Sequence, residues 1–390
     1  MRRHVGGGGL REDEYRALCV ECDRVLRAPD ATMERIAIPL LHVMREHPMF
    51  LERYEAVVGR RGTSADVARR WFRTLRRSAG WLHQLLQASL CDGRHWAGGE
   101  EMGNRVDVLF VSHLLNPAHA GQDSDFYFGD TPSEVTSRGH PALVALINHT
   151  GISANALVGR WARGTVPRVV LANSLSVAAE RAARTGLKKE SRRLAACARQ
   201  MVPGLARRVL AQAAEAALSG SARTAMRIGL QIRALVAELQ PRAIVSTHEG
   251  HAWERVAFAG ARSARPGIRC IGYQHAAVFR LQHAIRRSLA PPYNPDLILT
   301  AGTVGRNQLE AARELYGVPV AVLGSNRVSK PETSAHATPR EIDACLVLPE
   351  GDINECNVLF DFSLSCAERL PDVRFVWRLH PLMSFARLVR

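Results

Sequence analysis

From about residue 105 onward, short β-branched runs alternate with stretches of helical periodicity, and this alternation constrains the fold more than any other feature. It is typical of a parallel sheet whose strands are joined by crossover helices. We predict strands at residues 106–112, 142–148, 168–173, 243–247, 268–273, 296–302 and 320–325. Together they predict one doubly wound α/β domain over residues 101–327.

Two longer helical stretches accompany this domain. Residues 10–98 carry apolar positions at helical spacing, so we predict an N-terminal helical region over residues 1–100. A second stretch, residues 176–239, is rich in Ala and Arg and longer than one crossover needs. We predict that it is an insertion that covers the site or contacts a partner.

The C-terminal part repeats the α/β pattern once. Residues 328–341 are polar, contain two prolines and lack periodicity, which predicts a linker. A strand, a helix and a strand are predicted at the end of the chain, over residues 344–351, 355–369 and 373–381. We therefore expect residues 342–390 to begin a second α/β domain. Only 60 residues follow Lys330, so we expect this domain to be incomplete and the chain to be a fragment.

The charge balance predicts an anionic partner. The 390 residues include 52 Lys and Arg against 37 Asp and Glu, a formal charge of +15. Residues 65–90 place Trp71 and several leucines on one helical face and arginines on the rest, which suits either an anionic lipid surface or, as the favoured alternative, core packing with a solvated basic face. Because no helix-turn-helix, RNA-recognition or zinc-finger pattern is present, we expect no specific nucleic-acid partner.

The eight cysteines are dispersed, as in proteins of a reducing compartment. Cys19 and Cys22 form a CxxC pair without a second pair at zinc-ribbon spacing, so we predict burial in a helix rather than metal binding. No apolar run has the length of a signal-peptide core or of a bilayer span. We expect a cytoplasmic protein, or one at the inner face of the cytoplasmic membrane.

Histidine residues recur where the predicted strands end. Ligands of open α/β sheets bind outside the carboxyl ends of the strands, so these positions are the first candidates for a site. The strand-end residues are His113, His149, His248, Gln274, His275 and His380. A single strand-end imidazole often only hydrogen-bonds a loop carbonyl, whereas five on one rim suit phosphate binding and proton transfer near neutral pH.

Glu249 is the strongest candidate for chemistry. It follows a predicted strand and precedes Gly250, which permits a tight turn, and a helix is expected to begin near Trp253. Its carboxylate would then point into the crevice, where burial can tune its pKa. The alternatives are an ion pair with Arg255 or a cap on the following helix, and either role would be inert.

The loop at residues 121–132 is predicted to lie near the same rim. Asp125 and Tyr127 suit a hydroxyl-rich ligand, while the alternative is an Asp-rich turn anchored by Phe126 and Phe128. The motifs of P-loop NTPases, zinc proteases and serine hydrolases do not occur in the sequence. Apart from His248 and His251, no pair of histidines has close ligand spacing, so we expect neither a metal site nor a cofactor.

Five stretches, "STHEGHAWERVAFAGAR", "CIGYQHA", "YNPDLILTAG", "VAVLGSNR" and "FVWRLHP", together resemble the GT-B glycosyltransferases of bacterial surface polysaccharide biosynthesis. The likeness covers about residues 105–381. It implies a GT-B fold, in which two Rossmann-like domains face each other across a cleft. It also implies an acceptor on the first domain, a nucleotide-sugar donor mainly on the second, and transfer without a bound metal.

The resemblance also implies roles for individual residues. Glu249 before Gly250 matches the acidic-Gly motif, whose carboxylate is the general base, and His380 before Pro381 matches the His-Pro motif, whose imidazole contacts the donor phosphate. The donor-binding set is Arg378, His380, Pro381, Glu350 and Gly351. The acceptor-binding set is His113, Asp125, Tyr127, His149, His251, Gln274 and His275.

The resulting hypothesis is a transferase that moves a sugar from a nucleotide-sugar donor to a glycan or lipid-linked acceptor in surface polysaccharide synthesis. The alternative from another class is a non-catalytic GT-B-like binding or scaffold protein, because the donor domain is expected to be incomplete. Nucleic-acid binding through the basic helices is a third hypothesis that rests on charge alone.

Overall fold

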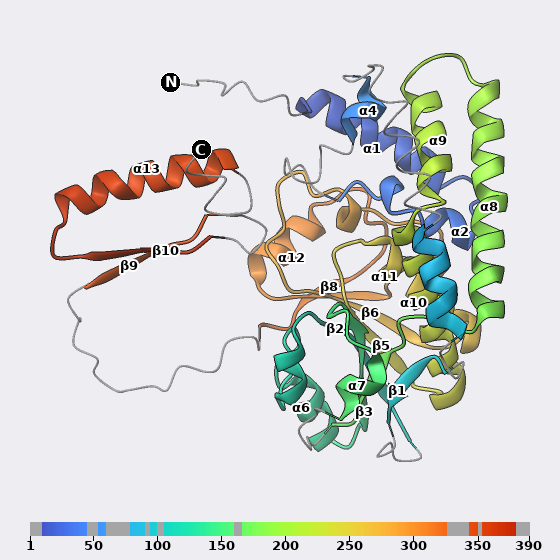
Figure 1. Ribbon diagram of the computed structural model, residues 1–390, viewed down its shortest axis with the longest axis horizontal. Coiled ribbons are helices and arrows are strands. Elements are labelled where there is room, and N and C mark those ends of the chain that lie inside the picture. Colours follow the sequence, from blue (N-terminus) through green and yellow to red (C-terminus); the bar gives the residue numbers. More distant parts are fainter. Residues whose placement is uncertain are drawn as a thin grey trace. The chain divides into compact units, whose positions relative to one another are not determined.

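The computed structural model describes residues 10–44, 54–59, 79–89, 94–99, 105–159, 166–325, 343–349 and 353–379 (Figure 1). The chain divides into two compact units. The larger unit comprises Leu10–Glu46 and Arg53–Ser329, and the smaller comprises Met1–Gly9, His47–Glu52 and Lys330–Arg390. Each unit is held together by contacts within itself.

An eight-stranded sheet forms the centre of the larger unit, with the strand order β1-β4-β3-β2-β5-β6-β7-β8 among the described residues. The strands are β1 (Trp96–Gly98), β2 (Val108–Leu114), β3 (Ala142–Asn148), β4 (Arg168–Leu171), β5 (Ala243–Thr247), β6 (Arg269–Gln274), β7 (Leu297–Thr300) and β8 (Val320–Val322). All pairs are parallel except β1 with β4. The seven strands predicted for this domain are therefore confirmed, as is the α/β class.

Strand β1 corrects the prediction that residues 10–98 are helical throughout. Trp96, Ala97 and Gly98 pair with Leu171, Val170 and Val169 of β4 in antiparallel register. Three residues are too few to show a period of two, and the extended conformation comes from hydrogen bonding to the edge of the sheet. Residues 79–89 are helical as predicted, whereas 65–78 lie outside the described residues.

Both faces of the sheet are covered, which explains why its strands are continuous apolar runs. On one face, α10 (Gly220–Leu239) and α11 (Ala252–Ala264) pack against the strands, with Ile232 and Phe258 in one buried cluster. On the other face, α7 (Ala154–Val158) contributes Ala154 and Leu157 to a second cluster, and α6 (Thr131–Ser137) lies before β3. Helix α12 (Thr303–Glu310) joins β7 to β8.

The predicted insertion at residues 176–239 forms three helices, α8 (Val177–Gln200), α9 (Leu205–Ala216) and α10. Helix α10 is the crossover helix that packs on α11, and glycine makes this close approach possible. A Cβ on Gly260 would lie 2.5 Å from the Gly229 carbonyl oxygen. Helices α8 and α9 lie beside each other next to the N-terminal helices (Figure 1). The buried ion pair between Glu190 and Arg35, at 2.5 Å, anchors α8 to these helices.

The N-terminal helices α1 (Glu12–Leu26), α2 (Met33–Ile36) and α4 (Glu55–Val58) belong to the larger unit. A buried polar cluster ties α1 to the segment after β6. Asp23 contacts Arg287 Nε at 2.6 Å and His283 Nε2 at 2.9 Å. The segment 10–44 is thus part of the packing of the α/β domain.

The smaller unit contains β9 (Ala344–Val347), α13 (Ile353–Arg369) and β10 (Arg374–Trp377). Strands β9 and β10 are parallel, with Ala344 opposite Arg374. The predicted strand, helix and strand are confirmed as a βαβ unit. Residues 328–341, which were predicted to form a linker, lie outside the described residues.

Candidate functional site at the switch point of the sheet

The strand order of the sheet reverses between β2 and β5. From β2 the chain proceeds to β3 and β4 on one side, and from β5 to β6, β7 and β8 on the other. Diverging crossovers leave a crevice outside the carboxyl ends of the two central strands. His113 of β2 and the segment after Thr247 of β5 occupy these ends.

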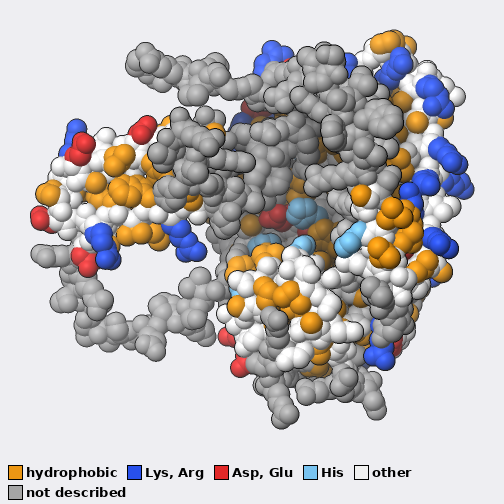
Figure 2. Space-filling model, viewed as in Figure 1, with side chains coloured by type: hydrophobic (Ala, Val, Ile, Leu, Met, Phe, Trp, Pro, Cys, Tyr) orange, Lys and Arg blue, Asp and Glu red, His pale blue; other side chains and the backbone are white. Residues whose placement is uncertain are grey.

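Aromatic and imidazole rings from separate segments meet at this edge. His113 Nδ1 lies 2.9 Å from His149 Nε2, and His113 Nε2 lies 3.1 Å from Thr247 Oγ1. The ring of Tyr127 is edge-on to His113 at 5.5 Å and to His275 at 4.6 Å. We call His113, His149, His251, His275 and Tyr127 the histidine rim. Figure 2 shows histidine side chains gathered beside acidic side chains on one face of the molecule.

Two imidazoles of the rim are neutral near pH 7. Burial, aided by the neighbouring His149 and His251, lowers the pKa of His113 to about 3. Partial burial also lowers the pKa of His149. Near neutral pH His113 therefore supplies neither positive charge nor proton transfer, and both of its ring nitrogens are already engaged by His149 and Thr247.

Glu249 lies on a turn that its backbone holds tightly. The N–H groups of Glu249, Gly250 and His251 all donate to the carboxylate of Glu254, at 3.0, 2.7 and 2.9 Å. Gly250 has φ +87°, and a Cβ there would lie 2.3 Å from the carbonyl carbon of Ala284. Only glycine satisfies both conditions at this position of the turn.

The Glu249 side chain faces the rim. Only 12% of it is exposed, and its Oε2 lies 3.3 Å from His251 Nε2. The two structural roles considered for it belong to other groups: Glu254 accepts the N–H groups at the start of α11, and the Arg255 guanidinium donates to the carbonyls of Ala284 and Arg287. The carboxylate of Glu249 thus lies beside His251 at the carboxyl end of β5.

Two of the strand-end residues lie beneath the rim. His248 is fully buried, with Nδ1 3.0 Å from Glu254 Oε2, and its ring packs on Gly272, where a Cβ would lie 2.7 Å from His248 Cγ. Gln274 is 3% exposed, and its Oε1 would lie 2.7 Å from a Cβ on Gly305 of α12. His248 and Gln274 therefore pack at the end of the sheet, and the assignment of Gln274 to acceptor binding stays a prediction.

The loop at residues 121–132 is built around Asp125. Its Oδ1 accepts hydrogen bonds from Ser112 Oγ and from the N–H groups of Tyr127 and Phe128, each at 2.8 Å. Phe128 is buried and packs against Phe110 with ring centroids 5.1 Å apart. Asp125 thus shapes the turn, as the structural alternative predicted, and the turn delivers Tyr127 to the rim.

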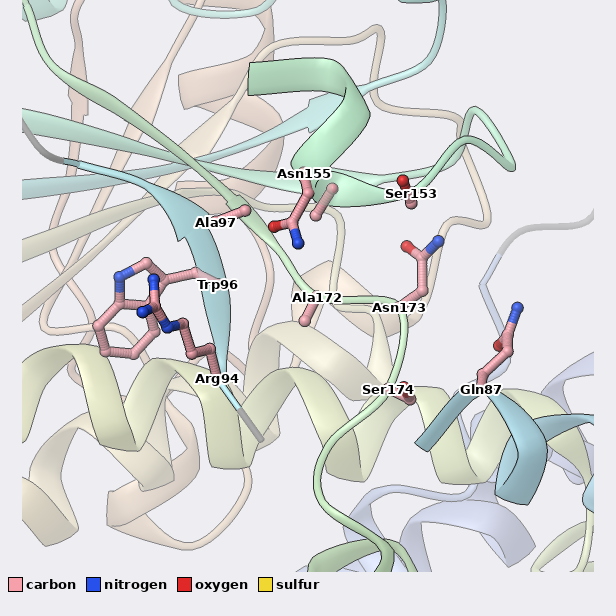
Figure 3. A pocket seen from close by; sticks show the side chains of 10 residues that line it. Gln87, Arg94, Trp96, Ala97, Ser153, Asn155, Ala172, Asn173 and Ser174 are labelled. Carbon is pink, nitrogen blue, oxygen red and sulfur yellow. The ribbon is translucent and has the colours of Figure 1, made fainter. Parts of the chain in front are cut away.

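A cavity that the sequence did not indicate lies farther along the same edge, at the end of β4. Its volume is about 460 Å³. Trp96 of β1, Asn155 of α7 and Asn173 after β4 contribute to its wall (Figure 3). Asn148 Nδ2 donates to Asn173 Oδ1 at 2.9 Å, which links the cavity to the segment that carries His149. The only signal in the sequence was an asparagine at the end of each of β3 and β4.

The residues assigned to the donor belong to the smaller unit. The backbone N–H of Arg378 donates to the Val347 carbonyl at 3.1 Å and so extends the pairing of β10 with β9. Glu350, Gly351, His380 and Pro381 lie outside the described residues. Their assignment therefore stays a prediction.

Within the described residues, no three His, Cys, Asp or Glu side chains are grouped so as to hold a metal ion. Cys19 and Cys22 are buried in α1, as the sequence predicted. No helix in the described ranges has both the length and the apolar character required to cross a bilayer.

The sequence matches no protein-family model and no curated protein.

Proposed function

We propose that this chain is a glycosyltransferase of GT-B type that transfers a sugar from a nucleotide-sugar donor to a hydroxyl of a glycan or lipid-linked acceptor. One observation supports it most: the Glu249 carboxylate lies on a rigid turn at the switch point of a doubly wound sheet, next to His251 and the histidine rim. A carboxylate so placed suits the role of general base toward an acceptor hydroxyl.

In the proposed reaction the acceptor oxygen attacks the anomeric carbon of the donor sugar. The bond from that carbon to the phosphate oxygen breaks, and the nucleotide leaves with the bonding electrons. Glu249 takes the proton of the acceptor hydroxyl. His380 is proposed to stabilise the negative charge of the departing phosphate, as the resemblance implies.

The electrostatics of the rim favour the acceptor over the donor as its ligand. Because His113 is neutral and both of its ring nitrogens contact other side chains, it offers no positive charge to a phosphate. Tyr127 adds an aromatic ring beside the same imidazole. We therefore propose that the rim binds the acceptor. The basic charge of the chain suits the cytoplasmic face of an anionic membrane as the place of reaction.

The test measures nucleotide release by the 390-residue chain from UDP-, GDP- and CMP-sugars with glycan and lipid-linked acceptors. Glu249→Gln should lower kcat by about 100-fold or more, with donor affinity nearly unchanged, because general-base catalysis contributes about 10²–10⁴. Glu238→Gln, an equal charge change at an exposed position of α10, is the matched control. Ordinary turnover by Glu249→Gln would remove this residue from the mechanism. Donor binding in calorimetry without turnover of any donor would favour the binding-protein alternative.

A further inference from the structure

We propose that Glu254 is a positioning residue: together with His248 it forms a buried support that sets the direction of the Glu249 and His251 side chains. The inference deepens the proposed function and rests on it for its kinetic consequence. Its structural part concerns the turn alone and can be tested without any substrate.

Glu254 holds the turn through one carboxylate. Its Oε2 accepts the N–H groups of Gly250 and His251, and both of its oxygens lie within 3.1 Å of the Glu249 nitrogen. Three consecutive backbone donors thus converge on a side chain that is only 1% exposed. Hydrogen bonds from N–H groups to a buried carboxylate are about twice as strong as neutral ones, so this contact governs the shape of the turn.

The carboxylate of Glu254 is ionised although it is buried. Burial alone would raise its pKa, but the neighbouring His248 and the backbone N–H of Glu249 outweigh burial and hold the pKa below its usual value. An ionised acceptor has no proton to offer to the turn, so all of its bonding capacity goes to the surrounding donors. The negative charge is therefore part of how the turn is held.

His248 supports Glu254 from the side of the sheet. Burial lowers the pKa of His248, although the neighbouring Glu254 acts in the opposite direction. Its Nδ1 lies 3.0 Å from Glu254 Oε2, close enough for an ion pair with the carboxylate. Contact with Gly272 of β6 and with Phe258 of α11, at 5.9 Å between ring centroids, fixes the ring. The support thus joins β5, β6 and α11 directly below the proposed base.

Loss of this support should misdirect the base rather than remove it. The Glu249 carboxylate stays in the chain when Glu254 changes, but three donors lose part of their acceptor and the turn can relax. A displacement of about 1 Å at a reacting group can cost about 100-fold in rate. The expected signature is a fall in kcat with little change in KM.

The first test uses amide hydrogen exchange of the unmodified 390-residue chain, followed by NMR. The amides of Glu249, Gly250 and His251 should exchange slowly even though they lie in a turn. Exchange at the rate of unprotected loop amides would overturn the proposal, and this result requires no variant to fold.

The second test compares Glu254→Gln, which keeps the shape and removes the charge, with Glu254→Asp, which keeps the charge and shortens the side chain. In both, the three amides should exchange at least about tenfold faster, because Gln removes the charge from the acceptor and the shorter Asp side chain moves the charge away from the three donors. The ¹⁵N shift of His251 Nε2, which lies 3.3 Å from Glu249 Oε2, should also change. The matched control is Glu190→Gln, which removes another buried carboxylate at its ion pair with Arg35. Unchanged amides and an unchanged His251 shift would refute the support.

The kinetic test separates this inference from the proposed function. Glu254→Gln should lower kcat about 100-fold with KM within about twofold, whereas Glu190→Gln should lower neither. If the unmodified chain turns over none of the donors, the proposed function fails, and if Glu249→Gln keeps ordinary turnover, the role of Glu249 as base fails; in both cases the exchange data still decide the structural support. If Glu249→Gln is inactive but Glu254→Gln keeps full kcat, the function stands and the positioning role is refuted.

Discussion

Replacement of Gly250 by alanine should lower the free energy of unfolding of the larger unit more than the same replacement at a glycine whose Cβ would meet no neighbouring atom. Two costs add at this position. The first is backbone strain, because φ is +87° and a left-handed conformation costs an L-residue about 1–2 kcal/mol. The second is overpacking, because the new Cβ would lie 2.3 Å from Ala284 C and 2.4 Å from Ala284 O.

The contacted atoms belong to the backbone of η4 (Ala284–Arg286), which cannot turn aside as a flexible side chain would. The Ala284 carbonyl also accepts a hydrogen bond at 3.0 Å from the buried Arg255, so a shift of η4 disturbs a second contact. Overpacking of this kind typically costs about 1–3 kcal/mol. The expected total for Gly250→Ala is about 2–5 kcal/mol in the free energy of unfolding.

Gly139 offers a matched control. Its φ is +86°, nearly the same as that of Gly250, but a Cβ there would meet no atom within 4 Å. Gly139→Ala should therefore cost only the backbone term of about 1–2 kcal/mol. Urea unfolding followed by circular dichroism measures both variants. If Gly250→Ala differs from Gly139→Ala by less than about 0.5 kcal/mol, the close approach to η4 does not determine this position.

Three further outcomes follow from the buried groups. The pKa of His113 is lowered to about 3 in the folded chain, so its contribution to the free energy of unfolding is complete above its unfolded pKa and is lost as the pH falls from about 6.5 toward 3. Between pH 6.5 and 5, the free energy of unfolding of His113→Asn should therefore fall by about 1.5 kcal/mol less than that of the unmodified chain. Equal decreases in denaturant titrations would contradict this. Asp23→Asn should cost about 3–5 kcal/mol in the free energy of unfolding because it leaves the fully buried Arg287 without its carboxylate. Glu12→Gln, at a solvent-exposed ion pair with Arg16, should leave the free energy of unfolding nearly unchanged in the same assay. Burial raises the pKa of Cys19 to about 12 and also raises that of Cys22. Mass spectrometry after iodoacetamide treatment at pH 8 should therefore find both cysteines unmodified, whereas the exposed Cys197 should react. Labelling of the folded chain at Cys22 would be inconsistent with this packing.

Local pattern was sufficient for most of the fold. The strands β2 to β8 were predictable because burial on both faces requires apolar, β-branched runs, and such runs are visible without knowledge of their neighbours. The helices after β4 and the βαβ unit at 344–377 were likewise readable from periodicity. Strand β1 was missed because three residues acquire their conformation only by pairing with β4.

The candidate site was predictable in its location but not in the roles of its members. Strand-end positions follow from the order of strands and loops, so Glu249, His113 and His149 could be chosen from the sequence. Asp125 and Gln274 resembled ligand-binding residues in type and position, but their partners are distant in sequence. Ser112 Oγ and the backbone N–H of Phe128 donate hydrogen bonds to the Asp125 carboxylate, and Gly305 of α12 lies against Gln274.

The α/β class, the strands and the edge of the sheet at which a site would form could be inferred from local pattern, because burial and chain connectivity restrict which residues occur along each strand. Three properties became visible only in the folded chain: Glu254 holds the turn that carries Glu249, the pKa of His113 is lowered, and Gly250 lies against the backbone of Ala284. These properties depend on which groups meet in three dimensions and on how much water remains between them. Neither quantity is a function of residues that are adjacent in the chain.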